Sequence, residues 1–309
     1  MNILKTMQKN RILIIAGGKK KKLEDFKEPV KKLGLDVKIA SLSELNYSSD
    51  TPYKLKIGAT DVDKFSLIYI RVVGTRLEDL TLLCNYAKEK GIKIVDHLYE
   101  ESILMPSSLG KSIETAKLIK AGIPVPKTYF GSLTTVIKKA KSEFGFPFVI
   151  KSTTGKKARE VWSPNTEEEL ESLLKVLKKL EQKSHMRFFT QEFIKGSQRI
   201  RVFLIGGKAV AAITRPTKWR RRFIDKVNGD FPEAEKKAII PVPEEDAYLA
   251  IKSARAVSLD IAGVDILKDD KTRKSYILEV NAAPSWGAVK KDTGIIVEEE
   301  ILKYLASLI

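Results

Sequence analysis

Residues 262–281 read AGVDILKDDKTRKSYILEVN and carry the strongest local signal in this chain of 309 residues. Two alternating apolar stretches flank the polar residues 268–274, which predicts an antiparallel β-hairpin. A turn centred on position 272 pairs Asp265 with Glu279, and both acids face away from their apolar neighbours. Asn281 lies two residues beyond Glu279 and points the same way. We therefore expect three oxygen-bearing side chains on one face of the hairpin.

These three side chains suit a metal site. Two carboxylates directly opposed on a sheet repel each other, and a hard divalent cation with oxygen ligands relieves that cost. Asp265, Glu279 and Asn281 are therefore candidate ligands of Mg²⁺, with Mn²⁺ as a second candidate, in a site that bridges substrate phosphates. The alternative is an ordinary solvated face that carries acidic residues without binding a metal.

Composition excludes several classes of protein. Hydrophobic residues make up 43% of the chain and charged residues 31%, which is typical of a soluble globular protein. A single cysteine, Cys84, excludes a disulfide framework, and two histidines disfavour a His-based zinc site and a Ser-His-Asp hydrolase. The early apolar run at 12–16 is too short for a signal sequence or a membrane span. We therefore expect a cytoplasmic protein with no membrane partner.

The formal net charge of +17 indicates polyanionic partners. The excess lies in residues 111–240, which carry 28 basic and 13 acidic side chains, whereas residues 241–309 have a net charge of −3. Residues 215–222, RPTKWRRR, place five cations around Trp219. Three interpretations stay open for them: a lid over a nucleotide and an acidic substrate, a nucleic-acid contact in which Trp219 stacks on a base, or a solvated loop.

Hydrophobic periodicity divides the chain. Short apolar runs alternate with helical stretches in the first hundred residues, which predicts an open parallel βαβ sheet. Its strands are expected at 11–16, 36–39, 66–72 and 92–95, with helices at 23–33 and 75–90. Gly17-Gly18 begins a dinucleotide fingerprint, but lysines occupy the following positions and the motif fails.

The rest of the chain alternates between helical and strand periods. Helices are expected at 108–121, 133–144, 166–180, 244–259 and 293–308. Strands are expected at 127–130, 147–151, 188–193, 200–205, 210–215, 262–267 and 275–281, with Gly206-Gly207 as a hairpin turn. A long irregular stretch is expected at 216–240. We predict three domains, at 1–105, 106–190 and 191–309.

In this order, the motifs resemble those of the ATP-grasp ligases, and within that superfamily the RimK-type glutamate ligases. Lys111, on the helix in residues 106–122, resembles the first nucleotide-binding lysine of the family. PFVIKSTTG at 147–155 resembles the strand that presents a second lysine, here Lys151. QEFIKG at 191–196 resembles the hinge that holds adenine, and DIL with EVNAAP resembles the metal signature.

The resemblance implies an α/β chain with an ATP-grasp fold, in which two α+β subdomains hold ATP after an N-terminal parallel βαβ domain. It implies a ligase that uses ATP and Mg²⁺ to phosphorylate a carboxylate, which an amine then attacks to form an amide or peptide bond. The expected substrates are an amino acid such as glutamate and the carboxylate of a peptide, protein or small molecule.

The resemblance also assigns site residues. The phosphates would contact Lys111 and Lys151, and the metal would be held by Asp265, Glu279 and Asn281. The adenosine would lie against Gln191, Glu192, Phe193, Ile194 and Gln198. The γ-phosphate, the acylphosphate or a substrate carboxylate would contact the arginines Arg201, Arg215 and Arg220.

Two segments depart from the family pattern. The loop that follows Lys151 has one glycine at 153–159, where the family has a glycine-rich loop that closes over phosphates. Residues 197–199 offer no acid for the ribose hydroxyls, so Gln198 is the candidate substitute. The rival hypothesis is therefore a catalytically weakened ATP-grasp scaffold that serves as a basic nucleic-acid- or protein-binding module. A homo-oligomer stays an open alternative.

Overall fold

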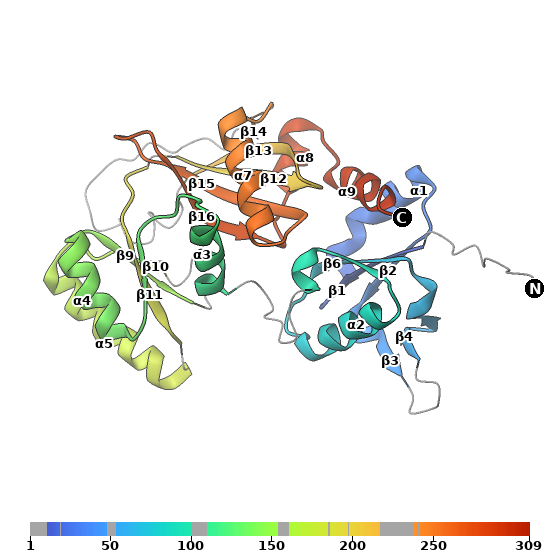
Figure 1. The fold of residues 1–309 in the computed structure, drawn as a ribbon, viewed down its shortest axis with the longest axis horizontal. Helices are drawn as coiled ribbons and strands as arrows, with labels where there is room; N and C mark the ends of the chain where they lie inside the picture. The colour runs from blue at the N-terminus through green and yellow to red at the C-terminus, as the bar shows by residue number, and fades with distance from the viewer. Residues whose placement is uncertain are drawn as a thin grey trace, which may run out of the picture.

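The computed structural model describes residues 11–18, 20–47, 54–100, 110–153, 161–184, 186–196, 198–216, 238–239 and 241–309. Figure 1 shows the N-terminal, central and C-terminal sheets spread along the long axis of the molecule, with the C-terminus beside the N-terminal sheet.

The N-terminal sheet is four-stranded and parallel, in the order β2-β1-β6-β7. Its strands are β1 (Ile12–Ala16), β2 (Val37–Ser41), β6 (Leu67–Val72) and β7 (Lys93–Val95). Every residue of β1 is buried, as expected of a parallel strand covered on both faces. The predicted open parallel sheet is therefore confirmed, with boundaries within two residues of those expected.

Helices and short turns connect these strands. Between β1 and β2 lie the 3-10 helix η1 (Lys20–Phe26) and α1 (Lys27–Leu33), and α2 (Leu77–Glu89) precedes β7. A small antiparallel sheet was not predicted; it contains β3 (Leu45–Tyr47), β4 (Leu55–Ile57) and β5 (Thr60–Asp61). The remaining 3-10 turns are η2 (Leu42–Glu44), η3 (Val62–Lys64) and η4 (His97–Tyr99).

The central sheet is antiparallel, in the order β10-β9-β11-β8. Its strands are β8 (Thr128–Phe130), β9 (Phe148–Ser152), β10 (Val161–Trp162) and β11 (Phe188–Glu192). In Figure 1 the helices α4 (Leu133–Phe144) and α5 (Glu167–Ser184) lie on the outer side of this sheet. Their apolar faces share one core with β9 and β11. The other face of the sheet is therefore left for the site.

The C-terminal sheet is antiparallel, in the order β14-β13-β12-β15-β16. Its strands are β12 (Gln198–Ile205), β13 (Lys208–Pro216), β14 (Ala238–Ile239), β15 (Ile261–Lys268) and β16 (Ser275–Asn281). The expected turn at Gly206-Gly207 is present, and both glycines have the positive φ that such turns require.

Helices cover both faces of this sheet. One core includes α3 (Lys111–Lys120) and α7 (Glu244–Ala256). A second core joins α8 (Gly287–Thr293) and α9 (Val297–Ala306) to the N-terminal sheet. The closing helix expected at 293–308 is present as α9 but begins at Val297, and α8 was not predicted; Gly294 adopts a left-handed conformation and ends α8. The three domain boundaries stay a prediction.

Two polar contacts tie the N-terminal sheet to the C-terminal sheet. Asp96, which follows β7 and is fully buried, accepts hydrogen bonds at Oδ1 from the N–H groups of Asp260 and Ile261, each at 2.8 Å. Arg71 on β6 lies 3.9 Å from the ring centroid of Trp286 and donates to the carbonyl oxygen of Pro284 at 2.6 Å. The chain after β16 is thereby fixed against the N-terminal sheet.

Candidate functional site

The hairpin of β15 and β16 places Asp265 directly opposite Glu279, which confirms the predicted pairing. Gly263 opposes Asn281 in the same register. The register shifts by one residue between Asp265 and Ile266, so Ile266 pairs with Ile277 and Leu278 is the bulged residue. A turn centred on position 272 would also pair Ile266 with Leu278, and that part of the prediction is wrong, although the end of the hairpin that carries the acids is as predicted.

Asp265 is completely buried and is held by two arginines from β12. Arg201 lies directly opposite it and binds it with two hydrogen bonds, Nε to Oδ1 at 2.5 Å and Nη2 to Oδ2 at 2.7 Å. Arg199 brings Nη1 within 3.5 Å of Oδ2. Both oxygens of the carboxylate therefore face guanidinium groups, in the bidentate arrangement that makes such pairs strong.

Glu279 is paired with Lys111, the first residue of α3. The Lys111 Nζ lies 2.6 Å from Glu279 Oε1 and 3.5 Å from Glu114 Oε2. Burial lowers the pKa of Lys111, but the two carboxylates outweigh it and the net pKa is raised. Burial raises the pKa of Glu114 to about 7, against the opposing effect of Lys111. Lys111 and Glu279 are 168 positions apart in the chain, and together with Glu114 they form one charged cluster.

Lys151 on β9 brings a second lysine to this cluster. Its Nζ donates to Gln191 Oε1 at 2.6 Å, and Gln191 Nε2 donates to Thr128 Oγ1 at 2.9 Å. The pKa of Lys151 is lowered to about 8, chiefly by withdrawal from water and secondly by the charge of Lys111, whereas Glu279 and Glu114 oppose the shift. The charges of Lys111 and Lys151 therefore influence each other between the central and C-terminal sheets.

The other predicted site residues are less clearly grouped. The Glu192 side chain accepts the N–H of Lys127 at 2.7 Å, so it is already engaged with the backbone. Phe193 and Ile194 follow β11, and Ile194 is buried. Gln198 and Arg215 lie on β12 and β13, with only their backbones described, and Arg220 and the 153–159 loop beyond Thr153 lie outside the described residues.

Two members of the cluster were missed by sequence analysis. Arg199 could have been found because it alternates with Arg201 on one strand face. Glu114 could have been found because an acid three residues after a helical lysine lies on the same side of the helix.

The oxygen donors of the hairpin fit Mg²⁺ in type. Two carboxylates are opposed, and each has a basic partner, Lys111 for Glu279 and Arg201 for Asp265. Glu279 is 37% exposed and is the accessible carboxylate of the two, whereas Asp265 is enclosed by arginines. Asn281 uses its amide nitrogen on the Gly263 carbonyl oxygen at 3.4 Å. Among the described residues, no three or more His, Cys, Asp or Glu side chains gather to hold a metal ion.

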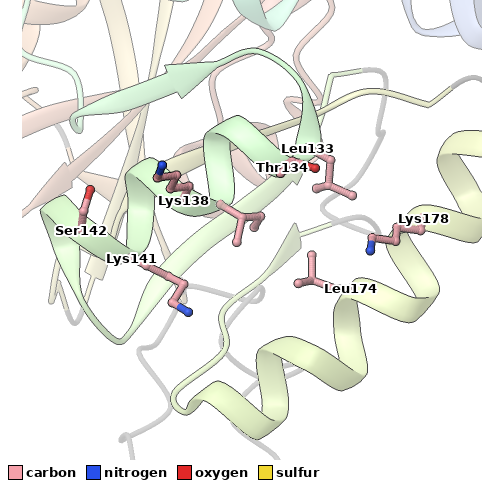
Figure 2. Close-up of a pocket in the computed structure, with 8 residues that line it drawn as sticks. Leu133, Thr134, Lys138, Lys141, Ser142, Leu174 and Lys178 are labelled. Carbon is pink, nitrogen blue, oxygen red and sulfur yellow. The ribbon is translucent and has the colours of Figure 1, made fainter.

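A cavity of about 520 Å³ lies elsewhere, between α4 and α5 (Figure 2). Its apolar side chains include Leu133 and Leu174, and Lys138, Lys141 and Lys178 surround them. Lys141 is paired with Glu167 at 2.6 Å. None of the predicted site residues lines this cavity, so it is separate from the charged cluster.

No described helix has the length and apolar character needed to cross a membrane.

The chain is similar to a protein family, to several relatives and to several solved structures. The family model of the RimK-like ATP-grasp domain matches residues 110–305. A relative from Syntrophotalea carbinolica, named "Probable alpha-L-glutamate ligase", is 28% identical over 208 residues. The match covers 66% of this chain and 65% of the relative, just under two thirds of that protein.

Two solved structures of the ATP-grasp ligase PsnB resemble the chain. One, complexed with minimal precursor, has a TM-score of 0.72 at 17% identity and covers 97% of this chain and 100% of that chain. The other, complexed with a phosphomimetic variant of minimal precursor, Mg and ADP, has a TM-score of 0.68 at 15% identity. It covers 96% of this chain and 98% of that chain.

Proposed function

Because the chain belongs to the RimK-like ATP-grasp family, we propose that it is a ligase that joins a carboxylate to an amine with ATP and Mg²⁺. The predicted ATP-grasp fold is confirmed by the structural neighbours, and ATP and Mg²⁺ fit the family. One observation carries the proposal: Lys111 pairs with one of two opposed carboxylates, and Lys151 lies near enough for the charges of Lys111 and Glu279 to shift its pKa. Cations for phosphates beside oxygen ligands for a metal are what phosphoryl transfer requires.

The chemistry follows from what these side chains can do. Lys111 and Lys151 would neutralise the phosphates of ATP, and Glu279 with Asn281 and Asp265 would hold Mg²⁺. The metal would supply charge neutralisation at the transferring phosphoryl group. A substrate carboxylate would then attack the γ-phosphorus, which forms an acylphosphate and releases ADP. The amine would attack the acylphosphate carbon, which forms the amide and releases phosphate and a proton. The protein contributes position and charge rather than covalent chemistry.

The contacts in the structure change the roles that we propose for some of the predicted site residues. Arg201 was expected to contact phosphate or substrate, but its contacts make it first a partner of Asp265. Gln191 would act by orienting Lys151.

The adenosine would contact the segment that follows β11. Phe193 and Ile194 would enclose the adenine ring, and Glu192 would contact adenine through its backbone groups. Gln198 would contact the ribose. Arg215 and Arg220 stay proposed substrate contacts.

The substrates are proposed from two kinds of support. The curated relative is named as a probable glutamate ligase, and the PsnB neighbour was solved with a precursor. The positive charge of residues 111–240 exceeds what ATP alone needs. We therefore propose an amino acid, such as glutamate, as the amine and the carboxylate of an acidic peptide, protein or small molecule as the acceptor.

The test is a screen with the full chain. ATP, MgCl₂ or MnCl₂, single amino acids and acidic peptides are combined, and release of ADP and phosphate is measured. Mass spectrometry then looks for a product heavier by one amino-acid residue. We expect release that depends on both the amine and the carboxylate. A protein that neither binds ATP nor is stabilised by it would contradict the proposal and favour the basic binding module instead.

Lys151 gives the proposed nucleotide site a pH dependence. With its pKa at about 8, Lys151 is charged at pH 7 and largely neutral at pH 9. Because the charged form attracts phosphate, we expect ADP affinity, measured by calorimetry without metal, to fall by about tenfold between those pH values. In Lys151→Arg the guanidinium stays charged, so the fall above pH 8 should be much smaller. Lys120→Arg, on the exposed side of α3, is the control; equal slopes in all three proteins would refute the role.

A further inference from the structure

Glu114 is the buried acid beside Lys111, and the expected family motifs do not include it. Its side chain is 4% exposed, and it lies three residues after Lys111 on α3. We propose, on the basis of the function given above, that Glu114 is a positioning residue that keeps Lys111 and strand β16 together when Glu279 turns to a divalent cation.

The two oxygens of Glu114 have different partners. Oε1 accepts the backbone N–H of Val280 at 3.0 Å, and Oε2 lies 3.5 Å from Lys111 Nζ. Val280 stands between Glu279 and Asn281, two of the proposed metal ligands. Glu114 therefore links the helix that presents the lysine to the strand segment that presents the ligands.

Lys111 is shared by two unequal carboxylates. Glu279 makes the shorter contact, at 2.6 Å, but its side chain is 37% exposed and has room to reorient. Glu114 is farther, at 3.5 Å, but it is enclosed and tied to Val280. If a cation takes the carboxylate of Glu279, Lys111 loses its nearer counter-charge. Glu114 then remains to hold the ammonium group beside the phosphates.

A purely structural role would not need a charge here. Burying a carboxylate costs free energy, and a well-packed apolar residue often stabilises such a site as well or better. α3 also packs against the sheet through Leu118, in the same apolar core as Val280. The helix therefore has apolar anchorage of its own, and the Glu114 carboxylate acts on Lys111 and the backbone of β16.

Glu114→Gln separates charge from hydrogen bonding, because the amide oxygen still accepts the Val280 N–H. Glu279 would then be the remaining carboxylate partner of Lys111, and a cation would have to displace Lys111 from Glu279 in order to bind. We expect the dissociation constant of Mn²⁺ in the presence of ADP, measured by electron paramagnetic resonance, to rise by about tenfold. ADP affinity without metal should change by less than about twofold. A general loss of structure would instead weaken ADP binding as well.

Glu28→Gln is the matched control, because Glu28 also pairs with a lysine three residues away, at 3.1 Å, but on the exposed surface of α1. Unchanged Mn²⁺ affinity in Glu114→Gln, with a wild-type protein that binds ADP and Mn²⁺, would overturn the proposal.

A second measurement keeps this result apart from failure of the proposed function. Hydrogen exchange at Val280, followed by mass spectrometry on metal-free protein, should accelerate in Glu114→Ala and stay slow in Glu114→Gln. A wild-type protein that binds neither ADP nor Mn²⁺ would refute the ligase function. Unchanged exchange at Val280 in Glu114→Ala would separately refute the link between α3 and β16.

Discussion

Replacing Glu279 with alanine is expected to lower ATP turnover by about 10³-fold, which corresponds to about 4 kcal/mol of lost transition-state stabilisation. Glu279 is the accessible carboxylate of the hairpin, and it faces both Asp265 and Lys111. Without it, the metal would lose its most available ligand. The measurement is ADP release at saturating ATP and Mg²⁺.

The fold should tolerate this substitution. Glu279 is partly exposed, Lys111 retains Glu114, and the repulsion between Glu279 and Asp265 disappears. We therefore expect the free energy of unfolding to change by about 1 kcal/mol or less. Glu143→Ala is the matched control, since Glu143 is also 37% exposed and pairs with a lysine, Lys127, at 2.8 Å. Wild-type turnover in Glu279→Ala, or an equal loss in Glu143→Ala, would contradict the assignment.

The pairing of Asp265 with Glu279 could be predicted because it is local. Alternating residues and one polar turn specify a hairpin, and a hairpin fixes its own register. The bulge at Leu278 could not be predicted, because an extra residue leaves the alternation on each side intact. Sequence reasoning therefore placed the acids correctly and misplaced the residues nearer the turn.

The side-chain partners of the charged residues could not be predicted from the sequence, for a different reason. Arg201 and Asp265 are 64 positions apart and meet only because β12 lies beside β15 in the sheet. Gln191 meets Lys151 in the same way, across β9 and β11. A residue type indicates what a side chain can bind, and tertiary pairing determines which partner it has. Arg201 was accordingly expected at a phosphate or a substrate carboxylate, and its partner in the structure is the Asp265 carboxylate.

That pairing gives the largest expected effect on stability. We expect Arg201→Met to lower the free energy of unfolding by about 3 kcal/mol, the lower end of the range for breaking a buried ion pair. Asp265 is fully buried and would lose two hydrogen bonds, at 2.5 and 2.7 Å. Arg199, at 3.5 Å, offsets part of the loss. Urea unfolding of the purified protein measures the change.

The double variant Arg201→Met/Asp265→Asn separates stability from catalysis. Removing the buried charge should restore at least half of the lost free energy of unfolding, because no carboxylate remains to be neutralised. Ligase activity should stay low in the double variant, since the neutral amide introduced by Asp265→Asn is a poorer ligand for a divalent cation than a carboxylate. Recovery of both properties would show that Asp265 serves only the fold, and recovery of neither would show that Arg201 contributes through other contacts.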